Sequence, residues 1–444
     1  MRYCPRPRHC RGLSTAQADR EACRQALSRL VFRGKDLEPG PDIRRGRLRV
    51  IKEGAVFQPQ SAYAFYSPTK VLSGNKALEN LPVELDGMNA VKPLILTTPA
   101  LSARGREKIV ASAFGDSNLT IGVFAGVPSQ PDLRLIRELY GLYRDNGYDA
   151  IIALGGGPVL DTAKALNVAV SGRPEDLESL ADRKPLTKKL RPLAAILSLD
   201  LSGCEMTRYA SLGPLSLTSP ALIPDLMIID SRTVPVEEHK IMAATALMSM
   251  TQAVEACLHP ARNPLTDAYA YGAARFIMEN ITNVLRNPSD RKGRLALANA
   301  AFFAQTSFDN LAPGMVYELG MAISRSCQTN QGLIMGLLLP HFLLLEMRKE
   351  IATRNDLYLF IGGPEAFAGT MAEASSRKAV DRIVEILLEL QNLVADFPRS
   401  IRDLGVKKDD LEGLIAQGSA AGVRGEYDPR DIRNILEKAW ETRF

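Results

Sequence analysis

The sequence has few of the residues that mark several large classes of protein. Its 444 residues include only six cysteines, four histidines and one tryptophan. No two cysteines form a Cys-x-x-Cys pair, so we expect a reducing compartment such as the cytoplasm rather than a disulfide framework. No uninterrupted apolar run is long enough to span a membrane, which argues against a membrane protein. The nearest such run, residues 332–347, contains Pro340 and predicts either a buried pair of helices or one kinked helix.

Most of the chain also lacks a strong charge of either sign. The formal net charge is +5, but residues 1–50 carry 13 Lys and Arg against 5 Asp and Glu, so the remainder has a net charge of −3. A nucleic-acid-binding body would need a basic face of its own, and we therefore expect no nucleic-acid partner. Residues 1–55 lack the apolar core of a secretory signal and predict a poorly ordered basic extension or an early start codon. The alternative is an Arg-rich transit peptide, against which Asp19 and Glu21 count.

From about residue 56 the hydrophobic pattern alternates between strands and helices. Strands are predicted at SAYAFYSP (61–68), PLILTT (93–98), LTIGVFAGV (119–127), AIIAL (150–154) and PLAAILSL (192–199), with helices over 130–146 and from about Pro158. This alternation predicts a parallel sheet, and we assign residues 56–232 to an α/β nucleotide-binding domain. Helical periodicity takes over after about Asp230, which predicts an all-helical domain over residues 233–444.

The stretch AIIALGGGPVLDTAK (150–164) joins a predicted buried strand to a predicted helix through three glycines. These are Gly155, Gly156 and Gly157. Glycines let the backbone approach a pyrophosphate, and a helix start offers N–H groups and the positive end of its dipole. A plain strand-to-helix turn would explain the glycines equally well. Asp161 and Lys164, which follow at one-turn spacing, favour dinucleotide binding, with Lys164 beside a phosphate or ribose.

The segment GGGPVLDTAK resembles the GGGSxxDxAK signature of the iron-dependent (group III) alcohol dehydrogenase family, in the superfamily that includes dehydroquinate synthase. Further segments are similar to the family at 67–82, 128–157, 197–212, 397–417 and 428–440. The resemblance covers roughly residues 60–440. It implies an α/β dinucleotide-binding domain, an all-α C-terminal domain, a site in the cleft between them, a small-molecule substrate and a homodimer.

The resemblance fails at the metal site. Family members hold one divalent metal with an Asp and three His. In the motif GxDALxHAxE the two ligand positions carry Met248 and Gln252 here. In the motif GxxHxxxHxxG…PHG they carry Tyr317 and Gln331, and the intervening His position, usually near the nicotinamide, carries Met321. These side chains supply neither a carboxylate nor an imidazole, so we expect no catalytic metal.

The cofactor loops depart from the family as well. The family's Ser after the three glycines is a proline, and the loop PTTAGTGSE becomes LSLDLSGCE. That loop keeps Ser198, but Leu199 and Asp200 stand near the expected cofactor. Family members that favour NAD often carry an Asp after the second strand, where this chain has Thr98. With Arg104 nearby, this exchange favours NADP over NAD.

Hydride transfer without a metal needs another electrophilic partner, or a substrate that is already activated. An activated carbonyl or an iminium is such a substrate, and the maleylacetate reductases of this superfamily act without a metal. The phenol of Tyr317 could donate to a developing oxyanion, with Gln252 and Gln331 orienting the same oxygen. Arg325 could bind a substrate carboxylate. The alternative for each of these residues is that it has no role in catalysis and only fills the space that the metal occupies in other family members.

Two hypotheses follow from these features. The first is a metal-independent, NAD(P)H-dependent oxidoreductase that acts on an activated carbonyl or imine in specialised metabolism. The second is a non-redox enzyme for a cyclisation or dehydration, or a catalytically silent binding protein, on the same fold. The changes at Pro158, Leu199 and Asp200 favour the second hypothesis, because they affect the cofactor loops as well as the metal site.

Overall fold

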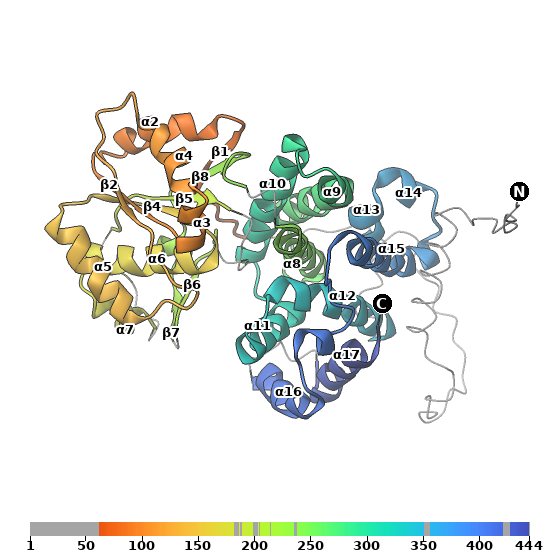
Figure 1. The fold of residues 1–444 in the computed structure, drawn as a ribbon. Coiled ribbons are helices and arrows are strands. Elements are labelled where there is room, and N and C mark those ends of the chain that lie inside the picture. The colour runs from red at the N-terminus through yellow and green to blue at the C-terminus, as the bar shows by residue number, and fades with distance from the viewer. Residues whose placement is uncertain are drawn as a thin grey trace, which may run out of the picture.

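In the computed structural model of the protein, the described residues form two regions of different secondary structure (Figure 1). The described residues are 62–181, 186, 189–198, 203, 205–213, 215–234, 238–349, 356–420 and 427–443. The predictions made for residues 1–55, and for Leu199 and Asp200, lie outside them.

The first region is built on a six-stranded parallel sheet in the order β1-β8-β5-β4-β2-β3. The strands are β1 (Lys70–Gly74), β2 (Pro93–Leu96), β3 (Gly122–Phe124), β4 (Ala150–Gly155), β5 (Leu193–Leu197) and β8 (Leu226–Asp230). A small antiparallel hairpin, β6 (Tyr209–Leu212) and β7 (Leu215–Thr218), stands apart from the sheet. The parallel α/β prediction is therefore confirmed.

Helices cover both faces of this sheet, which explains why β4 is a continuous apolar strand. Alternate residues of β4 belong to two separate cores: Ile152 and Leu154 pack under α2 and α4, and Ile151 and Ala153 pack under α5 and α6 (Figure 1). The helices here are α2 (Leu81–Gly87), α3 (Pro99–Ala103), α4 (Arg106–Ser112), α5 (Leu133–Asp145), α6 (Gly157–Ser171) and α7 (Asp176–Ala181). Asp132 starts α5 by accepting two backbone hydrogen bonds as its N-cap.

The predicted strand at residues 61–68 is wrong, since residues 62–69 form no strand and β1 begins at Lys70. The segment contacts the helical region instead, although Tyr63 and Tyr66 remain exposed. The ring of Phe65 stacks on Tyr269 with centroids 5.5 Å apart, and the backbone of Tyr66 pairs with the side-chain amide of Asn310. The apolar residues that suggested a strand are therefore mostly exposed, apart from Phe65, which packs on a helix.

The second region is helical, and none of the described residues from 238 onwards lies in a strand. Its helices are α8 (His239–Leu258), α9 (Pro264–Arg286), α10 (Arg291–Asp309), α11 (Met315–Cys327), α12 (Gln331–Lys349), α13 (Leu357–Gly362), α14 (Pro364–Ala368), α15 (Ala372–Leu393), α16 (Leu411–Ala420) and α17 (Pro429–Glu441). The central α8 packs against α9, α10 and α12. It is apolar enough to cross a bilayer, but 89% of its apolar window is buried inside the protein, as in the core helix of a soluble protein. The run at 332–347 is a single helix, α12, with Pro340 inside it.

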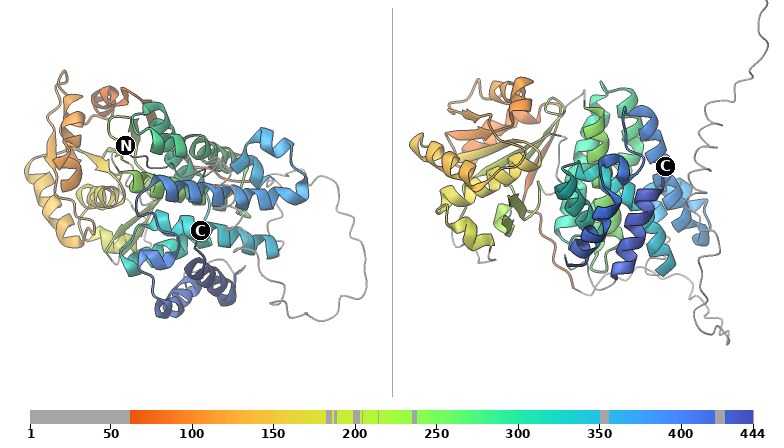
Figure 2. Two further views of the ribbon diagram at one scale, coloured as in Figure 1. Left: turned by 45° about the vertical axis from the view of Figure 1, so that its right-hand side comes forward. Right: turned by 60° about the horizontal axis from the view of Figure 1, so that its bottom comes forward.

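The two regions lie side by side in both views of Figure 2, and helix α10, labelled in Figure 1, contacts β1 and β8 of the sheet. Its Asn299 donates a hydrogen bond to Ser73 Oγ of β1 at 2.8 Å. Its last residue, Asp309, forms an ion pair with Arg208, which directly precedes β6, at 2.9 Å. These contacts fix the carboxyl ends of the parallel strands, where open α/β sheets bind ligands, against the helical region.

Candidate active site

The glycine loop forms the junction of β4 and α6 at this edge of the sheet. Gly155 ends β4 with φ +156°, and a Cβ there would lie 2.7 Å from a methyl carbon of Val159, so only glycine fits. Gly156 is the N-cap of α6 and Gly157 its first residue, and no side chain caps this helix. An uncapped helix start next to a close backbone turn is the geometry of a phosphate site.

Lys164 and Asp161 of α6 are both engaged with the strand β6. The fully buried ammonium of Lys164 donates to the backbone carbonyls of Thr207 at 2.9 Å and Tyr209 at 2.8 Å. Burial raises the pKa of Asp161 to about 7, against the lowering effects of Lys164 and of a backbone hydrogen bond from Ser211. Both side chains therefore hold β6 beside the glycine loop, and their contact with a nucleotide stays a prediction.

The other predicted cofactor residues lie at the ends of β2 and β5. Thr98 caps α3, and its hydroxyl accepts a hydrogen bond from the backbone N–H of Leu101 at 3.2 Å. Ser198 is fully buried, and its hydroxyl has no hydrogen-bond partner among the described residues, which do not include 199–202. Arg104, which favoured a 2′-phosphate in the sequence, forms an ion pair with Glu238. The cofactor roles of Thr98 and Ser198 stay predictions.

Gly203 and residues 205–208 cross from the sheet to the helical region and are fixed there by α10. Glu205 is fully buried and accepts hydrogen bonds from Gly203 N at 3.0 Å and from Gln305 Nε2 at 2.8 Å. The same Gln305 amide accepts the backbone N–H of Met206 at 2.8 Å. Sequence reasoning missed Gln305 and Asp309, because no motif signals a partner so far along the chain.

Met248 and Gln252, one turn apart on α8, both contact Gly203. Gly203 has φ +80°, and a Cβ there would lie 2.6 Å from Met248 Sδ and 2.9 Å from Gln252 Nε2. The amide of Gln252 donates to the carbonyl of Gly203 at 2.8 Å. Its Oε1 is buried and has no hydrogen-bond partner in the described part of the chain. The residues at two of the family's metal-ligand positions therefore contact this loop: Met248 packs against it, and Gln252 donates a hydrogen bond to it.

Glu255, the next residue along this face of α8, caps α11. Its carboxylate accepts the backbone N–H groups of Val316 at 2.6 Å and Tyr317 at 3.3 Å. Gly314 allows this approach, because a Cβ there would lie 2.3 Å from the carboxyl carbon. Burial raises the pKa of Glu255 to about 8, although both hydrogen bonds act to lower it. Sequence reasoning gave Glu255 no role.

The remaining predicted positions lie on α11 and α12. Tyr317 is buried, with its ring centroid 4.6 Å from that of Phe308. The amide of Gln331 donates to the backbone carbonyl of Tyr317 at 3.5 Å. Gly332 packs so closely on α8 that a Cβ would lie 2.0 Å from the carbonyl oxygen of Ala244, one turn before Met248.

The structure thus gathers three predicted site residues, Gln252, Tyr317 and Gln331, where α11 and α12 cross α8, together with Met248 at the fourth family ligand position. Arg325 lies elsewhere, at the exposed end of α11, with Nη2 at 3.4 Å from Ser211 Oγ. Its role in binding a substrate carboxylate stays a prediction.

Two models of known protein families match this chain, one over the α/β region and one over the helical region. Residues 68–231 match the family model described as "Iron-containing alcohol dehydrogenase", and residues 242–440 match "Fe-containing alcohol dehydrogenase family, C-terminal". The chain belongs to the iron-containing alcohol dehydrogenase family.

Relatives within the family cover most of the chain at low identity. An NAD-dependent methanol dehydrogenase from Bacillus methanolicus is 24% identical over 84% of this chain and 99% of its own length. A 1,3-propanediol oxidoreductase structure has a TM-score of 0.76 at 22% identity, over 85% of this chain and 100% of the other. A sulfoacetaldehyde reductase from Bifidobacterium kashiwanohense, solved in complex with NAD+, has a TM-score of 0.75 at 17% identity, over 86% of this chain and 100% of the other.

This family member carries a donor set that does not fit a divalent metal. A thioether, two amides and a phenol occupy the four ligand positions, and Met248 and Gln252 are pressed against Gly203. Divalent metals in catalytic protein sites are held mainly by carboxylates and imidazoles, and the softer ones also by thiolates. In the part of the chain that the structure describes, no group of three or more His, Cys, Asp or Glu residues could hold a metal ion.

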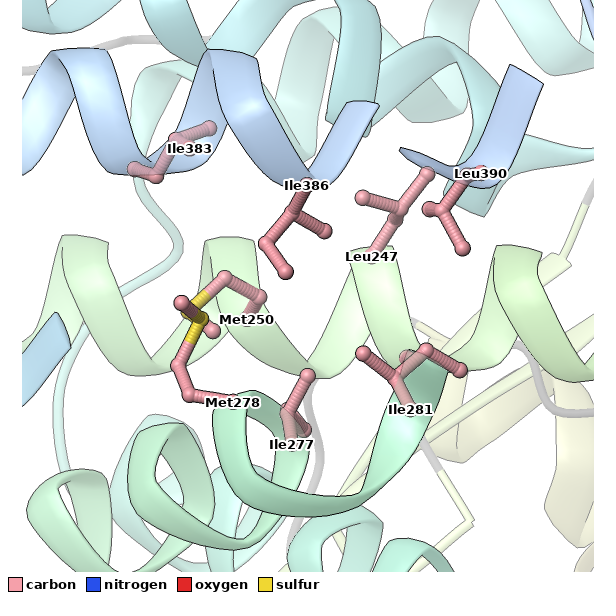
Figure 3. Close-up of a pocket in the computed structure, with 9 residues that line it drawn as sticks. Leu247, Met250, Ile277, Met278, Ile281, Ile383, Ile386 and Leu390 are labelled. Carbon is pink, nitrogen blue, oxygen red and sulfur yellow. The ribbon is translucent and has the colours of Figure 1, made fainter. Parts of the chain in front are cut away.

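A pocket in the helical bundle is unrelated to these residues. Figure 3 shows that side chains of α8, α9 and α15 surround it, among them Leu247, Met250, Ile281 and Ile386. All its lining residues are apolar, and its volume of about 10 Å³ is that of a packing void that holds at most about one water. It therefore offers no site for a nucleotide or a polar substrate.

Proposed function

We propose that this protein is a metal-independent oxidoreductase that reduces an activated carbonyl or an imine with NADPH or NADH. One observation carries the proposal. The four family ligand positions are occupied by residues that bind one another and the Gly203 loop, while the glycine loop keeps the backbone geometry of a phosphate site. The proposed protein thus still binds a nucleotide, next to a reaction site in which other residues replace the family's metal ligands.

The residues at the strand ends fit a nicotinamide nucleotide. Gly156 and Gly157 would hold its pyrophosphate at the start of α6, and the unpaired hydroxyl of Ser198 would donate to it. Thr98 would lie near the adenosine ribose. When bound, the reduced nicotinamide supplies a hydride.

The chain's own residues would orient and isolate the substrate. Met248 is buried and Met321 half-buried, so they exclude water from the reaction site and strengthen electrostatic interactions there. The phenol of Tyr317 would donate a proton to a developing oxyanion, which is the task of the metal in other family members. Glu255 positions Tyr317 by capping α11.

Four further features belong to the same proposal. The absence of an acid at Thr98 favours NADPH over NADH. The family resemblance supports a homodimer. The cysteine pattern supports a reducing compartment such as the cytoplasm, and a role in specialised metabolism follows from the altered site.

The test is a titration of purified, metal-analysed protein with NADPH and NADH, followed by nicotinamide fluorescence. Saturable micromolar binding by metal-free protein is the expected result. If neither nucleotide binds, the proposed oxidoreductase function is wrong.

A specific observation favours the second candidate, a non-redox enzyme or a binding protein. Lys164 and Thr98, which were expected to contact the cofactor, use their polar groups on the protein itself. If neither nucleotide binds in the titration, this candidate replaces the first, and the cleft should be screened with non-redox ligands.

A further inference from the structure

The side-chain amide of Gln252 has a fixed orientation that leaves a buried acceptor without a donor. Its nitrogen must face the carbonyl of Gly203, 2.8 Å away, because a carbonyl oxygen can only accept. The opposite atom, Oε1, is buried and has no hydrogen-bond partner among the residues that the structure describes. Leaving such an oxygen unpaired costs free energy, so the site is built for a ligand that brings an N–H or O–H group.

This acceptor lies where a substrate would react. Gln252 occupies a family ligand position, and Glu255, the next residue on the same face of α8, contacts Tyr317 N. The oxygen of an aldehyde or ketone carries only lone pairs and would be repelled by Oε1. The nitrogen of a protonated imine carries a hydrogen and would be bound by it. The orientation of the amide therefore distinguishes a C=N substrate from a C=O substrate.

The charges around the site favour a cation. Glu205 is fully buried and binds the same Gly203 peptide as Gln252, and Glu255 is buried one turn away. Glu318 is half-buried on α11, where burial raises its pKa and the charge of Arg325 acts to lower it. Glu318 lies two turns before Arg325, which contacts β6, so this face of α11 looks toward the α/β domain. Where these acids are ionised they attract a cationic ligand and repel an anionic one, and because burial raises the pKa of Glu255 to about 8, its share of this attraction grows as the pH rises toward that value.

We infer that the substrate is a protonated imine whose N–H is bound by Gln252 Oε1. The inference rests on the proposed function and narrows it. The imine carbon accepts a hydride, with its two electrons, from the reduced nicotinamide nucleotide. The electron pair of the C=N double bond moves to nitrogen, which keeps its proton and becomes the nitrogen of a neutral amine. The imine is reduced, the nicotinamide is oxidised, and no further proton donor is needed.

The experiment compares two probes on the full chain, 2-methyl-1-pyrroline as the imine and cyclopentanone as the ketone, with NADPH. We expect kcat/KM for the imine to exceed that for the ketone by at least about tenfold, the effect of one charge-assisted hydrogen bond. A second readout does not depend on turnover. The product 2-methylpyrrolidine should raise the melting temperature, and its ether counterpart 2-methyltetrahydrofuran should not.

Gln252→Met keeps the size of the side chain and removes the acceptor Oε1, together with the N–H group that donates to the Gly203 carbonyl. It should lower kcat/KM for the imine by about 10- to 100-fold and abolish the amine-induced shift, with nucleotide affinity unchanged. Gln391→Met is the matched control, since Gln391 also has a buried amide nitrogen but lies on α15, away from the cleft. The wild-type comparison decides the matter even if Gln252→Met does not fold.

The outcomes separate the two proposals. If neither nucleotide binds, the proposed function fails and this inference with it. If a nucleotide binds but the ketone is reduced as well as the imine, only this inference fails. The imine inference is also wrong under a third outcome. In that outcome a nucleotide binds, but the imine is not reduced and the product amine does not raise the melting temperature.

Discussion

The carboxylate of Glu255 accepts the backbone N–H of Tyr317 at 3.3 Å, and this bond ties α8 to the first turn of α11. Helix starts attract negative charge, so a glutamate from a neighbouring helix is a favourable cap. Gly314 makes the approach sterically feasible. Because Gln252 lies on the same face of α8, this contact also determines where the phenol of Tyr317 stands relative to the buried amide.

Glu255 should make the stability of the protein fall as the pH rises. Burial raises its pKa from 4.5 to about 8, with Glu318 and Glu346 adding to the rise. A raised folded-state pKa means that the folded protein binds the proton more tightly. Its stabilising contribution is complete below about pH 4.5 and is lost as the pH rises through about 8. At about 1.4 kcal/mol per pKa unit, the loss is on the order of a few kcal/mol.

Glu255→Gln removes this titration and should flatten the dependence of the melting temperature on pH between about 5 and 9. Thermal unfolding of both proteins across this range is the measurement. Glu365→Gln, on an exposed position of α14, should follow the wild-type curve. A Glu255→Gln curve parallel to that of the wild type would show that Glu255 does not titrate in this window.

Tyr317→Phe should distinguish carbonyl from imine reduction. The variant keeps the ring that packs on Phe308 and removes only the hydroxyl. A carbonyl oxygen needs a proton donor, so residual ketone reduction should fall by about 100-fold. A protonated imine needs none, and its reduction should fall by less than about tenfold.

Steady-state kinetics with both probes and a nucleotide titration make this measurement. Tyr271→Phe, a tyrosine that packs on Phe360 outside the site, is the control. Equal losses on both probes would mean that Tyr317 acts through structure rather than through its hydroxyl.

The sequence predicts those parts of the site whose signal is local. The strand β4, the glycine loop and α6 follow one another without a gap, so apolar run, turn and helix start are visible together. The family ligand positions Met248 and Gln252 were also identified one turn apart, and they do share a contact to Gly203.

Contacts between distant segments could not be predicted in this way. Gln305 and Asp309 bind residues about a hundred positions earlier, and only the folded arrangement of α10 beside the sheet brings them there. The hairpin β6–β7 was missed because its strands have four residues each and their pattern is only partly apolar. It captures Lys164, whose ammonium would otherwise be free for a phosphate.

Removal of metal should leave this protein unchanged. The donors at Met248, Gln252, Tyr317 and Gln331 do not fit a hard divalent cation, so chelation removes nothing that the fold or the chemistry needs. After dialysis against EDTA we expect the same melting temperature, nucleotide affinity and imine reduction. A metal-bearing member of the family, treated in parallel, confirms that the chelator acts. Activity that disappears with EDTA and returns with Fe²⁺ or Zn²⁺ would contradict metal independence.

Gly155→Ala should abolish nucleotide binding through a clash inside the loop. The added Cβ would lie 2.7 Å from Val159 Cγ2, at a φ that disfavours side chains, so the start of α6 must shift. The matched control is Gly141→Ala on α5, where a Cβ meets nothing within 4 Å and the helix should gain about 0.5–1 kcal/mol. Urea unfolding and nucleotide titration of both variants separate loss of fold from loss of binding. Adding Val159→Ala to Gly155→Ala relieves the contact, and partial recovery of nucleotide affinity is then expected. If Gly155→Ala binds nucleotide as well as the wild type, the close turn at β4 is not part of the phosphate site, and the dinucleotide would have to lie elsewhere along the strand ends.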